Sequence, residues 1–207
     1  MSIQTMALIG TGVMGMGIAQ IAALAGIQVR IYDAQAGAAC SGLAKLKITL
    51  EKLQLKAKIS EQQCMETLAR ITVLHEIEEI RGVDLVVEAI IENLDIKQGL
   101  FQQLERIVSA ETILATNTSS LSITSIAAEL QYPNRFAGFH FFNPVPLMKI
   151  VEVIAGLNTD ESVITKLLAM AKQMGHQGVR TQDTPGFIVN HAGRAYGTEA
   201  LKILSEA

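Results

Sequence analysis

The sequence has little charge for its length and no long apolar run. Charged residues make up 18% of the 207 residues, the formal net charge is −3, and no basic cluster occurs. This balance gives no indication of binding to nucleic acid or to a membrane surface. No apolar run reaches the roughly eighteen residues of a transmembrane helix, and no signal-peptide pattern precedes the first expected strand. We therefore expect a cytoplasmic protein.

Cysteines are also scarce, and the histidines show no pairing. Cys40 and Cys64 lie in segments of helical pattern without C-x-x-C spacing, so we expect two reduced thiols and no disulfide. His75, His176 and His191 are scattered along the chain. Because no spacing matches a set of metal ligands, the sequence predicts no metal centre.

The apolar content, in contrast, is high. At 49% hydrophobic, the chain can bury a sizeable core in one domain with a small appendage. Short apolar runs alternate with segments of helical periodicity, and no internal repeat occurs. This alternation is typical of an α/β fold.

The N-terminal segment contains a glycine pattern between an expected strand and an expected helix. The first apolar run breaks at Gly10-Thr-Gly12-Val-Met-Gly15, and apolar residues then recur at helical spacing up to Gly26. Gly10 permits a tight turn, and Gly12 lets backbone amides approach a pyrophosphate. Gly15 lets the helix lie close to the strand. The pattern predicts a dinucleotide site, and the alternative is a plain β–α–β turn.

The next apolar run, residues 29–33, ends in Asp33. A carboxylate at this position would accept hydrogen bonds from the adenosine ribose hydroxyls and repel a 2′-phosphate. No arginine occurs at positions 34–39. The sequence therefore favours NAD over NADP.

A lysine-rich segment of helical pattern follows. Its lysines and leucines alternate, at Lys45, Lys47, Lys52, Lys56 and Lys58 and at Leu43, Leu46, Leu50, Leu53 and Leu55. We expect a helical excursion that leaves the sheet. Two interpretations stay open: a solvated helix face with an apolar underside, or an arm whose lysines hold the phosphates of a coenzyme A substrate.

Polar residues follow two later apolar runs. The run 84–91 leads into Glu92 and Lys97, and the run 112–116 leads into Asn117 and Ser119. Ligands of open parallel sheets bind at such carboxyl ends of strands, so these residues are binding candidates. The alternative is that they only cap helices or carry helix-terminal charges.

One histidine and one carboxylate lie on two apolar runs on either side of a turn that ends at Pro146. His140 and Glu152 are separated by the turn Asn143-Pro-Val-Pro146, which redirects the chain, so we expect them side by side on neighbouring strands. A buried carboxylate would fix the imidazole tautomer and stabilise the imidazolium, as a general base requires. The alternative is a buried structural histidine.

Five motifs together closely resemble the 3-hydroxyacyl-CoA dehydrogenases. They are Gly10–Gly15 with Asp33, Glu88-Ala-Ile-Ile-Glu92-Asn-Leu-Asp-Ile-Lys97, Asn117-Thr-Ser119-Ser120-Leu121, Gly138-Phe-His140-Phe-Phe-Asn143-Pro-Val-Pro146, and Asp183-Thr-Pro185-Gly-Phe-Ile-Val-Asn190. The resemblance implies a Rossmann-type, doubly wound, mostly parallel sheet over residues 1–184 that binds NAD. A helical excursion follows its second strand. It also implies a helical dimerisation domain, with the acyl-CoA bound in the cleft between the two domains.

The resemblance further implies roles for individual residues. His140 matches the catalytic base and Glu152 its partner, while Ser119 and Asn190 match the groups that hold the substrate oxygen. The matching cofactor-site residues are Gly10, Thr11, Gly12, Val13, Met14, Gly15, Asp33, Glu92, Lys97, Asn117 and Asn143. The family also favours the coenzyme A interpretation of the lysine-rich arm. His191 stands where the family usually has arginine, which alters the hydrogen bonding expected there.

Residues 185–207 have the pattern of one helix with an apolar side, which Thr184 and Pro185 begin well. In the family this helix opens the second domain, so we expect a chain that contains only the first helix of that domain. An exposed apolar helix favours a homodimer, and we expect poor catalysis by the chain alone. The segment 193–200 hints at the bacterial branch of aromatic-acid breakdown, with a 3-hydroxyadipyl-CoA type of substrate, as an alternative to fatty-acid β-oxidation.

Two other functions stay open. Another NAD(P)-dependent β-hydroxyacid dehydrogenase would share the first 33 residues but rely on a lysine in a later helical domain, and the pair of His140 and Glu152 argues against it. A non-catalytic NAD-binding relative, such as the lens crystallins related to this family, would not need the polar residues retained at 119, 140, 152 and 190.

Overall fold

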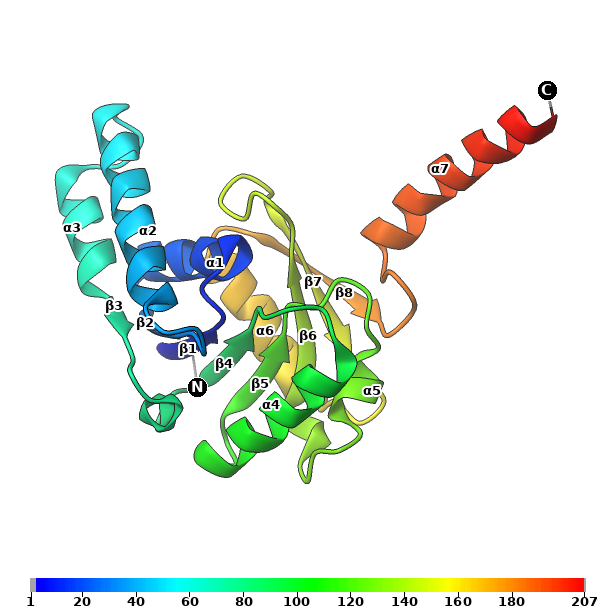
Figure 1. The fold of residues 1–207 in the computed structure, drawn as a ribbon, viewed down its shortest axis with the longest axis horizontal. Coiled ribbons are helices and arrows are strands. Elements are labelled where there is room, and N and C mark those ends of the chain that lie inside the picture. Colours follow the sequence, from blue (N-terminus) through cyan, green and yellow to red (C-terminus); the bar gives the residue numbers. More distant parts are fainter. Residues whose placement is uncertain (1–2, 207) are drawn as a thin grey trace.

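An eight-stranded sheet runs through residues 3–206, the part of the chain that the computed structural model describes (Figure 1). The strand order is β3-β2-β1-β4-β5-β6-β7-β8. Neighbouring strands pair in parallel, except that β6 and β7 are antiparallel. The strands are β1 (Thr5–Ile9), β2 (Gln28–Tyr32), β3 (Ile71–Val73), β4 (Leu85–Glu88), β5 (Ile113–Thr116), β6 (Phe136–Phe141), β7 (Ile150–Ala155) and β8 (Gln177–Gln182). The chain order reverses between β1 and β4, where doubly wound sheets bind ligands. The expected Rossmann-type sheet is confirmed.

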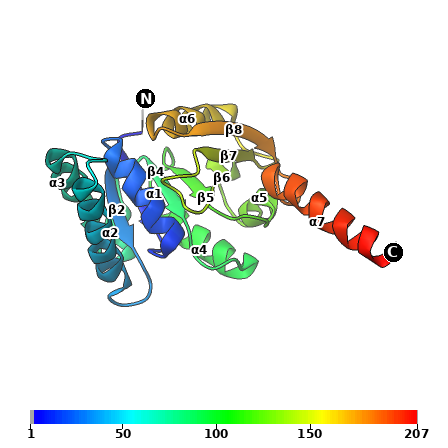
Figure 2. The ribbon, with the colours of Figure 1, turned by 90° about the horizontal axis from the view of Figure 1, so that it is seen from above.

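Helices cover both faces of this sheet (Figure 2). They are α1 (Val13–Leu24), α2 (Ala38–Leu55), α3 (Glu61–Ala69), α4 (Leu94–Ile107), α5 (Ile123–Ala127), α6 (Glu161–Gln173) and α7 (Val189–Glu206), with short 3-10 helices at Ile77–Ile80 and Pro133–Arg135. Residues of α1 and α6, such as Ile18 and Leu167, pack with Leu8 of β1 on one face. Residues of α4 and α5, such as Phe101 and Ile126, form the core of the other face.

Alternation along β6 and β7 decides which face carries the candidate base. Phe139 and Phe141 pack with the α1 and α6 side, whereas Phe136 packs with the α4 and α5 side. Successive side chains of a strand point to opposite faces. His140 and its strand partner Glu152 therefore lie on the α4 and α5 face.

The expected helical excursion after β2 consists of α2 and α3. Leu46 and Leu50 of α2 are buried, whereas Leu55, its last residue, is exposed. A capping box formed by Ser60 and Gln63 begins α3. Lys45, Lys47 and Lys52 are thus carried by α2, whose apolar underside packs on the domain, whereas Lys56 and Lys58 follow its end.

The expected strand over residues 84–91 is shorter than its apolar run. β4 ends at Glu88, because the Glu88 side chain accepts a hydrogen bond from the Ile90 amide and turns the chain away from the sheet. Local sequence gave no sign of this turn, since residues 89–91 are as apolar as the strand itself.

α7 projects away from the sheet and its other helices in both views (Figures 1 and 2). None of its residues is buried, and Tyr196, Leu201 and Leu204 are largely exposed. Over residues 3–206, no helix combines the length and apolar character that crossing a membrane requires.

Candidate active site

The glycine turn between β1 and α1 is shaped by close backbone approach. A Cβ atom at Gly10, where φ is +96°, would lie 2.7 Å from the Ala89 carbonyl oxygen, and one at Gly15 would lie 1.9 Å from the Gly10 oxygen. At Gly12, by contrast, a Cβ atom would meet nothing within 4 Å. Gly10 and Gly15 are therefore required by packing, whereas Gly12 leaves space above the turn for a ligand. This is the arrangement that a dinucleotide pyrophosphate needs.

Asp33 closes the same turn at the end of β2. Its Oδ2 accepts hydrogen bonds of 2.8 Å from the Thr11 amide and hydroxyl, and its Oδ1 accepts one from the Gln35 amide. Partial burial alone would raise the pKa of Asp33, but these bonds outweigh it and hold the pKa below its ordinary value. The carboxylate is thus ionised and keeps lone pairs for ribose hydroxyls.

A cavity of about 970 Å³ lies over the turn. Five of the predicted cofactor residues line it, and they are Thr11, Gly12, Val13, Asp33 and Asn143. Lys45 of the lysine-rich arm lines it as well. Met14 instead packs against the core. The cavity has the size of a small-molecule site and is flanked by a helix N-terminus and a carboxylate, so the residues present fit NAD.

His140 and Glu152 meet as expected. They are register partners on β6 and β7, and His140 Nδ1 lies 2.8 Å from Glu152 Oε2. Glu152 is fully buried and His140 is 5% exposed. The rings of Phe142 and Phe187 lie 4.5 Å and 5.7 Å from the imidazole ring. This apolar enclosure fixes the ring against its carboxylate partner.

Glu152 remains ionised despite its burial. Desolvation would raise its pKa, but the hydrogen bond with His140 and two bonds from the Val189 and Ile188 amides lower the pKa below its ordinary value. Each of these amides lies 2.9 Å from Oε1. A negative charge is therefore held beside the imidazole.

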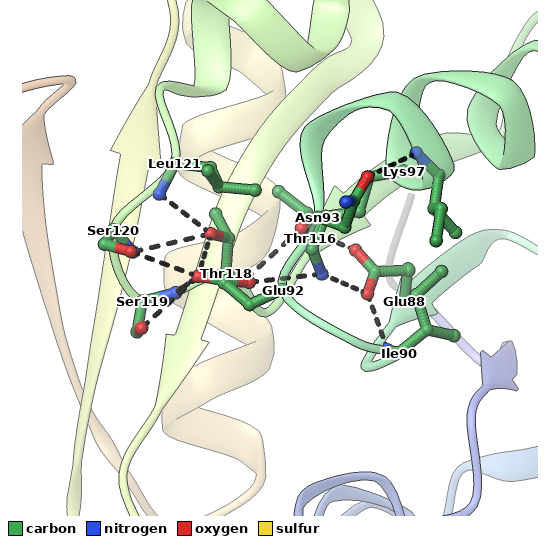
Figure 3. A network of polar contacts seen from close by, with 11 residues as sticks. Glu88, Ile90, Glu92, Asn93, Lys97, Thr116, Thr118, Ser119, Ser120 and Leu121 are labelled. Carbon is green, nitrogen blue, oxygen red and sulfur yellow. Dashed lines mark hydrogen bonds and ion pairs between the residues drawn. The ribbon is translucent and has the colours of Figure 1, made fainter.

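Glu92 organises the loop after β5 (Figure 3). Its Oε1 accepts hydrogen bonds from the Thr118 hydroxyl at 2.6 Å, the Ser119 amide at 2.8 Å and the Ser119 hydroxyl at 3.3 Å. Burial alone would raise the pKa of Glu92, but these bonds and the ammonium of Lys97 lower it. Asn190 Nδ2 donates to the Ser119 carbonyl oxygen at 3.3 Å. The structure thus brings together Ser119, Glu92 and Asn190.

Lys97 lies beneath this loop and is only 1% exposed. Its Nζ is 2.5 Å from Glu88 Oε1 and 3.5 Å from Glu92 Oε2 (Figure 3). Glu88 also accepts a bond of 2.6 Å from the Thr116 hydroxyl. Lys97 is thus enclosed by two carboxylates, one of which, Glu92, also bonds the Ser119 loop.

Asn117 connects the carboxyl ends of β5 and β6. Its Oδ1 accepts a hydrogen bond of 2.9 Å from the Phe141 amide, next to His140. This bond positions the end of the strand that carries the base.

No cluster of three or more potential metal-ligating side chains occurs between residues 3 and 206.

Comparison with known proteins identifies the family. The family model described as the NAD binding domain of 3-hydroxyacyl-CoA dehydrogenase matches residues 5–184. The chain belongs to this family. It therefore contains the NAD-binding domain of a 3-hydroxyacyl-CoA dehydrogenase family member.

Several relatives of known name are close in sequence and structure. A probable 3-hydroxybutyryl-CoA dehydrogenase of Bacillus subtilis is 46% identical over 206 residues, which cover 100% of this chain and 72% of the relative. The 3-hydroxyadipyl-CoA dehydrogenase of Escherichia coli is 44% identical over 205 residues, which cover 99% of this chain and 43% of the relative. The crystal structure of 3-hydroxybutyryl-CoA dehydrogenase from Escherichia coli is similar with a TM-score of 0.97 at 44% identity, over 100% of this chain and 44% of that chain. The chain thus spans less than half of some of these dehydrogenases.

Two residues of the dehydrogenase motifs have contacts that sequence reasoning did not assign. Glu88 is the buried partner of Lys97, and its only signal was a charge at the end of an apolar run. Asp183 accepts hydrogen bonds from the Ser122 hydroxyl and from the amides of Ile123 and Thr124, which begin α5. The separation of 59 to 61 residues along the chain concealed this contact from local patterns.

Proposed function

We propose that the protein is an NAD-dependent 3-hydroxyacyl-CoA dehydrogenase that oxidises the 3-hydroxyl group to a ketone. The observation that best supports this proposal is the buried pair of His140 and Glu152, whose Nδ1 and Oε2 atoms lie 2.8 Å apart. Both residues belong to the sheet beside which the cavity lies. A paired imidazole is the usual general base for removing a hydroxyl proton near neutral pH.

In the proposed reaction, His140 Nδ1 donates to Glu152, so Nε2 accepts the proton of the substrate hydroxyl. Glu152 stabilises the imidazolium that forms. The Asn190 side chain, and the Ser119 hydroxyl once it turns from Glu92, donate hydrogen bonds to the oxygen as it becomes a carbonyl. NAD, when bound, supplies the acceptor for the C3 hydride. The Gly10–Gly15 turn, Asp33 and Asn143 would hold it, together with Glu92 and Asn117. Lys97, which is buried against Glu88, would act through Glu92.

The proposal is tested by oxidation of NADH in the presence of acetoacetyl-CoA, followed at 340 nm with the whole protein. We expect a rate that requires both compounds and that NADPH supports poorly. A rate equal to that without acetoacetyl-CoA would contradict the proposal and favour a non-catalytic NAD-binding protein.

For the acyl group of the substrate we propose two candidates. One relative is named for 3-hydroxyadipyl-CoA and another for 3-hydroxybutyryl-CoA, so both are candidate substrates here. A panel of 3-hydroxyacyl-CoAs with and without a terminal carboxylate distinguishes them through kcat/KM. For the coenzyme A portion we propose the lysine-rich arm, because this arm borders the cavity assigned to NAD, which Lys45 lines, and its other lysines are exposed and can face an adjacent substrate.

For α7 we propose the role of first helix of a helical dimerisation domain, with domain boundaries at residues 184 and 185. Its exposed apolar side chains, including Tyr196, Leu201 and Leu204, support this role because a contiguous apolar helix side favours association. Light scattering on the whole protein should show a homodimer. We further propose that the protein acts in the cytoplasm.

A further inference from the structure

We infer that the backbone amides of Ile188, just before α7, and of Val189, its first residue, regulate the strength of the proposed general base through Glu152. The inference rests on the proposed function of His140. It adds that Ile188 and Val189 are positioning residues that act through their backbone N–H groups, and that the seating of α7 is thereby coupled to proton transfer.

The contacts divide the Glu152 carboxylate between two partners. Oε2 faces His140 Nδ1 at 2.8 Å, while Oε1 accepts from the Ile188 and Val189 amides at 2.9 Å each. Glu152 is 0% exposed, so bulk solvent does not screen these contacts. The positive ends of the two amide dipoles interact with the carboxylate of Glu152, the same negative charge that stabilises an imidazolium at His140. Their presence therefore weakens the attraction of Glu152 for a proton on His140.

The backbone before α7 is held in an uncommon conformation that aims these amides. Gly186 and Phe187 have φ values of +76° and +52°. The left-handed region is unfavourable for a phenylalanine, and Phe187 adopts it with its ring buried beside that of His140. Successive N–H groups that converge on one oxygen are typical of anion-binding turns. The same segment thus contacts both members of the catalytic pair.

The next residue joins this coupling to the substrate side. Asn190 follows Val189 on the first turn of α7 and bonds the Ser119 carbonyl oxygen at 3.3 Å. When this first turn packs against the sheet, Asn190 lies at the proposed site of the substrate oxygen. The two amides then partly compensate the negative charge of Glu152. Movement of α7 away from the sheet would remove both effects together. His140 would then retain a proton more strongly, which disfavours oxidation.

Other charged groups near the pair have partners of their own. Glu92 binds the Ser119 loop, and Asp183 binds the start of α5. Arg180, beside Val179 of β8, bonds Glu161, and His191 of α7 faces the Pro185 carbonyl oxygen. A substitution that removes only one α7 amide leaves these contacts in place.

Val189→Pro is such a substitution. Proline lacks the N–H group but is well tolerated at the first position of a helix, which Val189 occupies. Val189→Ala is the control, because it removes the branched side chain of a residue that is 37% exposed and keeps the amide. In the whole protein, we expect Val189→Pro to move the acidic limb of the kcat/KM profile for oxidation to higher pH by roughly half a pH unit. Val189→Ala, which keeps the amide, should show no such displacement of the limb, and the KM for NAD should agree between the two variants. Coincident profiles for the two variants would overturn the inference.

A second measurement does not depend on turnover. In NMR spectra of the chain, the amide ¹H and ¹⁵N shifts of Ile188 and Val189 should follow the titration of the His140 and Glu152 pair, and Glu152→Gln should abolish the response. Amides that ignore this titration would contradict the coupling even in an active enzyme. Failure of the proposed function would show differently, as the absence of acetoacetyl-CoA-dependent NADH oxidation in every variant.

Discussion

His140 and Glu152 are partners across the antiparallel strands β6 and β7, and one contact of 2.8 Å joins Nδ1 to Oε2. Because this contact occupies Nδ1, Nε2 is the ring nitrogen left to take the substrate proton. We therefore expect that substitution of His140 slows the chemical step and leaves cofactor binding intact.

We expect His140→Gln to lower turnover about 100-fold or more, the usual contribution of a general base, with NAD affinity nearly unchanged. Steady-state kinetics and calorimetric titration with NAD test both parts. His75→Gln is the control, since His75 is exposed and lies outside the site. Turnover equal to that of the control would remove His140 from the mechanism.

Asp33→Ala should weaken NAD binding and relax the rejection of NADP. The substitution removes the carboxylate that we propose as the partner of the ribose and leaves Lys45 as a nearby cation lining the same cavity. The ratio of kcat/KM for the two cofactors measures the effect. If the preference for NAD stayed unaltered, the assignment of Asp33 to the ribose would be wrong.

The glycine turn offers a matched pair of substitutions. Gly12→Ala adds a methyl group into open space at a φ of −68°, so the Tm should change little while NAD affinity falls because the pyrophosphate approach is blocked. Gly15→Ala places a Cβ atom 1.9 Å from the Gly10 oxygen and should destabilise the fold itself. Thermal unfolding with and without NAD separates the two effects.

Lys97→Met should destabilise the protein by about 3–5 kcal/mol, the usual cost of breaking a buried ion pair from one side. It leaves Glu88 fully buried without its cation and frees Glu92 from its neighbour. Urea unfolding measures the loss, and Lys47→Met, at a lysine whose side chain is 62% exposed, is the control. Equal stabilities of the two variants would contradict a stabilising role of the buried ion pair.

The contact of Asp183 with α5 predicts a pH dependence. Burial would raise the pKa of Asp183, but hydrogen bonds from Thr124, Ser122 and Ile123 hold it below the ordinary value. Such a group contributes stability above its unfolded pKa of about 3.9, and the contribution is lost as the pH falls through the lower folded value. Asp183→Asn should therefore cost about 1–3 kcal/mol at pH 7 and less below pH 4. Urea unfolding at both pH values tests the difference, and a constant difference would contradict it.

Local patterns were sufficient for the parts of the site that depend on adjacent residues. The glycine turn, Asp33 at a strand end, and the pairing of His140 with Glu152 each follow from residue spacing along one or two strands. Glu88 and Lys97 were harder, since a charge at a strand end does not reveal that it is buried.

Contacts between distant segments were beyond those patterns. Glu152 accepts from Ile188 and Val189, which lie 36 and 37 residues away, and Asp183 holds a helix that starts about 60 residues earlier. Backbone amides carry no sequence signature. Such bonds become visible only when the tertiary arrangement brings the segments together.

The antiparallel register of β6 and β7 has a consequence for how the site can fail. Phe139 pairs with Val153 and Phe141 with Val151, and all four are core residues on the opposite face from His140. A slip of one residue reverses every side chain, so the distance between base and acid cannot drift without turning the aromatic core outward. A change of this register would therefore be observed as unfolding rather than as a folded protein with a separated base and acid.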